Sequence, residues 1–81
     1  MQLEIISPDK KIYTGEVSSV HVPGTLGAFQ VLKNHAPIIS TLGSGKVKVK
    51  EQEGKEPLLF DISGGVVEVL KNKVIVLAEQ L

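Results

Sequence analysis

Residues 46–50 read KVKVK, and this short stretch decides the fold class. Charged and apolar side chains alternate at every position, which is typical of an antiparallel β-strand with one face in water and the other in a core. The stretch follows a turn-forming GSG at residues 43–45, and a second turn at residues 53–55, EGK, sends the chain back along residues 58–62. The sequence therefore predicts an antiparallel hairpin here.

Similar segments fill the rest of the chain. Short apolar or alternating runs, separated by Pro, Gly, Asn or Asp, occupy residues 3–5, 11–14, 16–22, 29–32, 37–42, 66–70 and 74–77. No stretch shows the three-and-four apolar spacing of an amphipathic helix over three turns. We therefore expect an all-β fold, a small β-sandwich or flattened barrel of about eight to ten short, mainly antiparallel strands, in one domain over residues 1–81.

Composition excludes several classes of function. The 81 residues include no cysteine, three aromatic residues, and nine basic residues, all lysine, against nine acidic ones. A neutral chain lacks the positive surface that binds nucleic acid or anionic membranes. No apolar run approaches the roughly 20 residues that cross a bilayer. We therefore expect neither nucleic-acid binding nor direct membrane insertion.

Residues 24–37, GTLGAFQVLKNHAP, hold the candidates for a chemical site. The two glycines Gly24 and Gly27 stand too close together for a phosphate-binding P-loop, and no Gly-Lys-Ser/Thr ending follows. His35 has no nucleophile or orienting group in a recognisable catalytic arrangement, and two histidines without clustered acidic residues do not make a metal site. We expect no catalytic residue, no metal and no cofactor. The positions expected to serve structural turns are Gly24, Asn34, Gly64 and Gly65.

Apolar residues in turn-like segments point to a partner protein. Leu26, Ala28 and Phe29 follow a glycine turn, and residues 37–39, PII, follow His35. A small sandwich cannot point all of these inward, and exposed apolar loops beside rigid strands are typical of a protein–protein contact. The residues thus indicate a binding module, with His35 held at a bend between strands or at an interface.

Six motifs occur in order along practically the whole chain. They are Gly15-x-Val17-x-x-Val20-x-Val22, Gly24-x-x-Gly27-x-Phe29, Val31-Leu32-x-Asn34-His35-Ala36-Pro37, Leu42-x-x-Gly45-x-Val47, Ile62-Ser63-Gly64-Gly65-x-Val67-Glu68-Val69 and Asn72-x-Val74-x-Val76-Leu77-Ala78-Glu79. This series resembles the N-terminal β-sandwich domain of the epsilon subunit of F-type ATP synthases. Gln30 stands where members of that family commonly have glycine, so the turn there is expected to be shaped differently.

The resemblance implies a non-catalytic rotor subunit in the central stalk of the F1Fo ATP synthase. Such a subunit joins the gamma subunit to the c-ring and couples proton translocation to the synthesis of ATP from ADP and phosphate in other subunits. It is a peripheral membrane protein on the cytoplasmic face of the bacterial inner membrane. The positions expected at the gamma-subunit interface are Ser7, His35, Ala36, Pro37 and Ser40. Those expected at the c-ring interface are Thr25, Leu26, Gly27 and Ala28.

Family members usually continue into a C-terminal helical hairpin, which inhibits in many bacteria and binds ATP in some. This sequence ends at Leu81, after the last expected strand, so we expect the hairpin to be absent. ATP binding and strong inhibition of ATP hydrolysis are therefore not expected of it.

Two other classes of protein compete with this interpretation. Biotinyl or lipoyl carrier domains are β-rich and of similar size, but they present a lysine at a hairpin tip in a Met-Lys-Met or Asp-Lys-Ala setting. Lys33, Lys55 and Lys71 lie at candidate turns without that setting. A carrier domain, or another β-rich protein-binding module, remains the alternative, and a stand-alone enzyme has no supporting group of residues.

Overall fold

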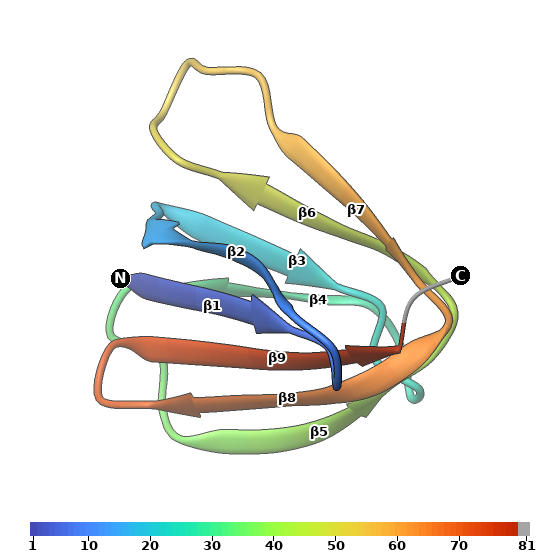
Figure 1. Cartoon of the computed structure of the whole chain (residues 1–81). Coiled ribbons are helices and arrows are strands. Elements are labelled where there is room, and N and C mark those ends of the chain that lie inside the picture. The colour runs from blue at the N-terminus through green and yellow to red at the C-terminus, as the bar shows by residue number, and fades with distance from the viewer. Residues whose placement is uncertain (80–81) are drawn as a thin grey trace.

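The computed structural model describes residues 1–79, which form nine β-strands in two sheets packed face to face (Figure 1). The strands are β1 (Gln2–Ile6), β2 (Lys11–Glu16), β3 (Ser19–Val22), β4 (Phe29–Leu32), β5 (Ile38–Leu42), β6 (Gly45–Lys50), β7 (Leu58–Ile62), β8 (Gly64–Leu70) and β9 (Lys73–Glu79). The predicted all-β sandwich is confirmed. None of the described residues forms a helix long and apolar enough to cross a membrane.

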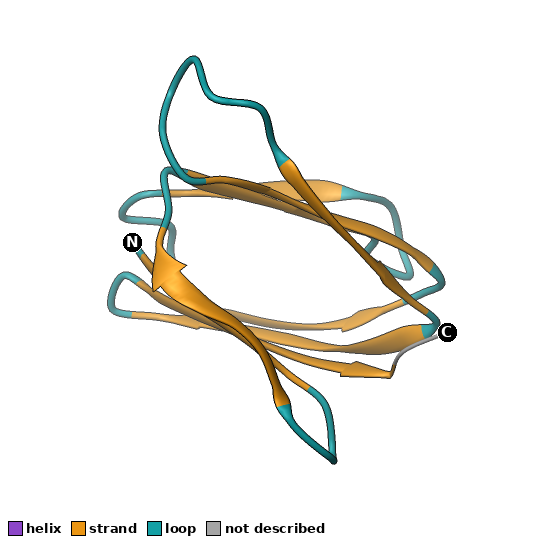
Figure 2. Ribbon diagram, turned by 45° about the horizontal axis from the view of Figure 1, so that its top comes forward, coloured by secondary structure: helices purple, strands orange, loops and turns teal. Residues whose placement is uncertain are grey.

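The two sheets differ in the number of strands and in the strands at their edges. The five-stranded sheet has the order β2-β1-β9-β8-β5, and the four-stranded sheet has the order β4-β3-β6-β7. In the part of the chain that the structure describes, every strand pair is antiparallel except β1 with β9. Figure 2 shows the two layers nearly edge-on, with loops gathered at the two ends of the sandwich.

The inner faces of both sheets form one core. Val47 and Val49 of the KVKVK stretch are fully buried, while Lys46 and Lys48 are exposed, as the alternation predicts. Valine dominates the core because its branched side chain packs well on a pleated sheet. The buried hydrophobic residues in the described part are Leu3, Ile5, Val17, Val20, Val22, Val31, Leu42, Val47, Val49, Ile62, Val67, Val69, Val74, Val76 and Ala78.

The predicted strand over residues 16–22 is two strands. Glu16 pairs with Gln2 in the five-stranded sheet, whereas Ser19 pairs with Lys50 in the four-stranded sheet. The chain therefore crosses between the sheets at residues 17–18, and a continuous strand is impossible there.

The turn expected at Gly64 and Gly65 is also wrong, because both residues belong to β8 and pair with Glu79 and Ala78 of β9. The change of sheet takes place at Ser63, whose amide donates to the carbonyl oxygen of Glu79 at 2.7 Å. A Cβ on Gly65 would overlap the carbonyl oxygen of Leu77, and Gly65 has a φ of 151°. Glycine is needed here for the close approach of β9 rather than for a turn.

Candidate docking surface

Residues 25–28, the expected c-ring segment, lie in a tight loop between β3 and β4. The amide of Gly27 donates to the carbonyl oxygen of Gly24 at 3.0 Å, which closes a four-residue turn. A Cβ added to Gly24 would lie 2.6 Å from the carbonyl oxygen of Gly27 and 3.0 Å from the ring of Phe29. The turn therefore depends on Gly24.

This loop is anchored on one side and open on the other. The amide of Thr25 donates to the carbonyl oxygen of Thr41 in β5 at 3.0 Å, and the two threonine hydroxyl oxygens lie 2.6 Å apart. Leu26, next in the chain, has a relative exposure of 103%. The loop thus holds a fully exposed leucine at a fixed place beside β5.

Residues 33–37 connect β4 to β5 at the opposite end of the sandwich (Figure 1). The amide of His35 donates to the carbonyl oxygen of Leu32 at 3.1 Å, and Asn34 between them has a φ of 64°. Asparagine tolerates this left-handed conformation better than most residues. Pro37 then restricts Ala36 to an extended conformation at the start of β5.

The ring of His35 is positioned by its own backbone. Nδ1 lies 2.7 Å from the carbonyl oxygen of Ala36. A carbonyl oxygen only accepts, so Nδ1 carries a proton in this hydrogen bond, and Nε2 has no hydrogen-bond partner in the described residues. In the described residues no hydrogen bond joins the ring to a carboxylate or a hydroxyl group. This geometry provides a directed polar group and lacks the partners of a general base.

The outward side of the five-stranded sheet carries a surface that the sequence analysis did not single out. We call it the outer apolar face, and its members are Ile6, Ile39, Val66, Glu68, Ile75 and Leu77. Register places Ile39, Glu68 and Ile75 in one row across the sheet, which ends at Glu4 of β1, and Val66, Leu77 and Ile6 in the next. Ile39 is 72% exposed and Leu77 is 51% exposed.

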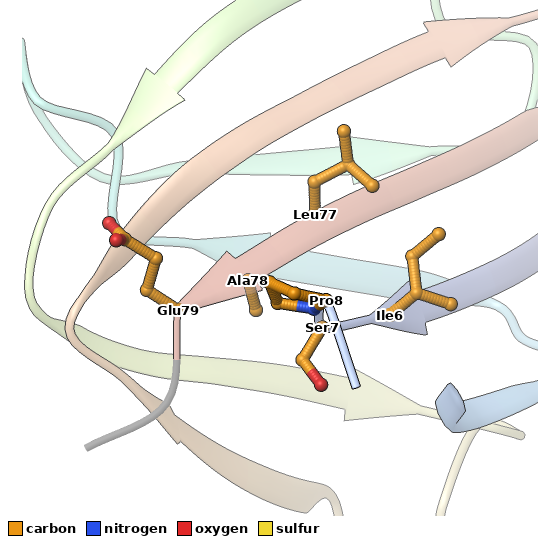
Figure 3. A pocket seen from close by; sticks show the side chains of 6 residues that line it. All are labelled: Ile6, Ser7, Pro8, Leu77, Ala78 and Glu79. Carbon is orange, nitrogen blue, oxygen red and sulfur yellow. The ribbon is translucent and has the colours of Figure 1, made fainter. Parts of the chain in front are cut away.

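Three shallow grooves lie along the outer apolar face. One groove is lined by Ile6, Ser7, Pro8, Leu77, Ala78 and Glu79. Figure 3 shows the side chains of Ile6 and Leu77 on the same side of the sheet. A second groove, at the other end of the face, includes Pro37 and Leu70. A third lies between them and is lined by Ile39, Val66, Glu68, Ile75 and Leu77. The grooves therefore run the length of the sheet.

Two expected gamma contacts border this face, and one does not. Ser7 lines the groove at one end and Pro37 lines the groove at the other. Ser40 pairs with Val67, whose side chain is buried, so Ser40 points to the inner side of the edge strand β5. Its hydroxyl donates to the carbonyl oxygen of Thr41 at 3.2 Å. Ser40 is thus separated from the outer apolar face by the thickness of the sheet.

A sequence signal for the outer apolar face did exist. In Val66-Val67-x-Val69-Leu70 and in Val74-Ile75-Val76-Leu77, apolar residues fall on both sides of a strand, whereas one solvated face would show strict alternation. The described residues contain no group of three or more His, Asp or Glu side chains placed to hold a metal ion. The surface therefore offers apolar contacts around the carboxylate of Glu68, with Glu4 and Glu79 at its borders, which suits a protein partner.

Comparison with known proteins identifies the family. The β-sandwich domain of the ATP synthase delta/epsilon chain matches residues 1–81. The ATP synthase epsilon chain of Chlorobaculum tepidum is 46% identical over 79 residues, which are 98% of this chain and 89% of that protein. The epsilon chain of Chlorobium limicola is 44% identical over 80 residues, covering 99% and 90%. The epsilon chain of Dichelobacter nodosus is 38% identical, and the match spans only 54% of its length.

Solved structures share the fold at lower identity. A chain of the Euglena gracilis mitochondrial ATP synthase, in a structure of OSCP, F1 and c-ring, superposes with a TM-score of 0.86 at 24% identity, over 94% of this chain and 48% of that chain. A chain in the central stalk and c-ring structure of the Tetrahymena thermophila mitochondrial ATP synthase gives 0.80 at 16% identity, over 98% and 63%. The resemblance found in the six sequence motifs is confirmed by the family match. The chain therefore belongs to the ATP synthase delta/epsilon family, within which it is one of the non-catalytic epsilon chains.

Proposed function

We propose that this epsilon chain is a central-stalk rotor subunit that joins the gamma subunit to the c-ring of the F1Fo ATP synthase. In this role it couples proton translocation to the synthesis of ATP from ADP and phosphate, which takes place in other subunits. It acts as a peripheral protein on the cytoplasmic face of a bacterial inner membrane. The observation that supports this proposal is one rigid sandwich that offers two separate contact surfaces.

The first surface is the outer apolar face, which we assign to the gamma subunit. Ser7 borders this face at one end and Pro37 borders it at the other, and His35 and Ala36 directly precede Pro37 in the chain. We propose that one partner lying along the sheet meets Ser7 and the turn that carries these three residues. Glu68 lies in the middle and has no ion pair within the described residues. The complementary partner surface is apolar with one lysine or arginine opposite Glu68, because an unpaired carboxylate buried in an interface is costly.

Ser40 makes a weaker candidate for direct contact than its neighbours. It faces inward from an edge strand, where only a partner that wraps around β5 would meet its side chain. We retain it as part of the proposed gamma interface at the rim.

The second surface is the loop of Thr25, Leu26, Gly27 and Ala28, which we assign to the c-ring. All four residues are exposed, and the two hydrogen-bonded threonines brace the loop against β5. Gly27 has a φ of 134°, and a Cβ added to it would meet no atom within 4 Å, which leaves room for a partner backbone. A short, braced loop suits the transfer of torque because it has little freedom to bend.

A pair of leucines on opposite sheets provides a matched test. Leu77 on the outer apolar face is 51% exposed, and Leu59 on β7 of the other sheet is 54% exposed. Binding of each alanine variant to purified gamma subunit would be measured by calorimetry. We expect Leu77→Ala to weaken binding about tenfold, the effect of roughly 1.4 kcal/mol, and Leu59→Ala to leave it unchanged.

The outcomes separate the parts of the proposal. Equal affinities for the two variants would remove gamma from the outer apolar face while keeping a gamma-binding subunit. Failure of the unsubstituted chain to bind gamma at all would overturn the rotor assignment.

A further inference from the structure

Asn72 lies in a hairpin turn that is remote in sequence from the proposed gamma contacts at residues 35–37. The turn joins β8 to β9, and Leu70 pairs with Lys73 across it. Lys71 has a φ of 49° and Asn72 has a φ of 62°, the pattern of a two-residue turn with both central residues in the left-handed region. Glycine would satisfy this backbone as well as asparagine does, so the turn alone does not explain the side chain.

The side chain of Asn72 reaches the turn that carries His35. Its Oδ1 accepts a hydrogen bond of 2.9 Å from the backbone amide of Asn34, 38 residues away. Because the donor is a backbone N–H group, the amide oxygen of Asn72 must face it, and the orientation of the side chain is determined. The backbone of Asn72 is also held, since its carbonyl oxygen accepts a 3.0 Å bond from the amide of Gln2.

This bond is the tie between the His35 turn and the body of the five-stranded sheet. The other hydrogen bonds within residues 33–37 are local: His35 to Leu32, and the His35 ring to Ala36. The turn passes from β4 in one sheet to β5 in the other, so backbone pairing in either sheet leaves its centre unsupported. Asn34 already has a left-handed φ, a conformation that most residues hold only when neighbours stabilise it.

We infer that Asn72 is a positioning residue for the gamma interface. Its side-chain amide holds the turn of residues 34–37 in the conformation that places Pro37 beside the outer apolar face, with His35 at a fixed place two residues before it. The inference rests on the proposed function, and it adds a residue that makes no contact with the partner itself. Without this hydrogen bond, the turn samples other conformations. The apparent affinity for gamma then falls in proportion to the fraction of molecules that keep the binding-competent conformation.

Two variants separate the side chain from the backbone of the turn. Asn72→Gly keeps the left-handed turn and removes the acceptor, whereas Asn72→Asp keeps an acceptor oxygen and tolerates the same backbone. Each variant, as the full 81-residue chain, would be examined for hydrogen exchange of the Asn34 amide by NMR and for affinity to purified gamma subunit. Urea unfolding of each would show that the sandwich is intact.

We expect Asn72→Gly to exchange the Asn34 amide at least fivefold faster and to bind gamma about fivefold more weakly, the size of one hydrogen bond of roughly 1 kcal/mol. Asn72→Asp should stay within twofold of the unsubstituted chain in both measurements. An unchanged exchange rate of the Asn34 amide in Asn72→Gly would show that the hydrogen bond does not hold the turn. Faster exchange with unchanged affinity for gamma would overturn the positioning role. If the unsubstituted chain does not bind gamma, the proposed function fails, and the exchange data still decide whether Asn72 holds the turn.

Discussion

The hydroxyl of Tyr13 donates a hydrogen bond of 2.6 Å to Glu51 Oε2 and so joins the two sheets at one open side of the sandwich. Tyr13 belongs to the edge strand β2, and Glu51 follows β6 of the other sheet. The ring of Tyr13 also packs on Phe60 of β7, with centroids 5.7 Å apart and planes inclined by 58°. One side chain therefore links the two sheets by an apolar contact and a polar one.

This link predicts a loss of stability in alkali. Burial of the ring, followed by the hydrogen bond and the negative charge of Glu51, raises the pKa of Tyr13 from 10.0 to about 12. Between those values the unfolded chain releases the proton while the folded chain keeps it, so stability is complete below about pH 10 and falls as pH rises towards 12. The midpoint of urea unfolding should therefore fall more over this range in the unsubstituted chain than in Tyr13→Phe.

The Tyr13→Phe variant also controls for the effect of all other ionisable groups on stability. All ionisable groups other than Tyr13 are the same in both proteins, so the difference between the two isolates the contribution of Tyr13. Parallel loss of stability in the two chains would show that Tyr13 does not keep its proton in the folded state.

Replacement of Leu26 tests the c-ring surface separately from the gamma surface. Because Leu26 is fully exposed, Leu26→Ala should change the free energy of unfolding by less than about 0.5 kcal/mol. We expect the complex of gamma with this variant to bind the purified c-ring about tenfold more weakly, while its affinity for gamma alone stays unchanged. Leu59→Ala is the matched control, and equal c-ring binding by both variants would remove the loop from that contact.

His35→Ala tests the other end of the gamma interface. The ring is held by the carbonyl oxygen of Ala36 through Nδ1, which leaves Nε2 to bond a partner group, so loss of the ring should weaken gamma binding by about 1–3 kcal/mol. His21→Ala is the control, since His21 is exposed on β3 of the four-stranded sheet. Calorimetry that finds both variants equal to the unsubstituted chain would take His35 out of the interface.

Gly65 and Gly54 distinguish a crowded glycine from one that is only in an unusual conformation. Both have positive φ, but a Cβ on Gly54 would meet no atom within 4 Å, whereas on Gly65 it would overlap the carbonyl oxygen of Leu77. Gly54→Ala should cost about 1 kcal/mol of stability. Gly65→Ala should cost several times as much, because β9 must move. Similar unfolding midpoints for the two variants would mean that β8 and β9 can separate at little cost.

Local patterns were sufficient to predict most of the strands. The alternation in KVKVK, and the turn residues on both sides of it, identified the β6–β7 hairpin, and residues 29–32 and 58–62 were predicted with the bounds that β4 and β7 have. These predictions succeed because strand periodicity and turn chemistry act between residues that are close in sequence. The division of residues 16–22 and the place of Gly64 and Gly65 inside β8 were missed, because each depends on which sheet supplies the pairing partner.

By itself, then, the sequence determined an all-β chain of short antiparallel strands, and the order of its motifs indicated the epsilon family. Only the tertiary structure decided where contacts can form. The outer apolar face takes its residues from β1, β5, β8 and β9, which the sheet order makes neighbours, and Asn72 reaches Asn34 only because the sandwich brings two distant turns together. Side-chain alternation is a local property of the backbone, whereas a surface of this kind depends on strand pairing across the whole chain, and no short window of sequence contains that information.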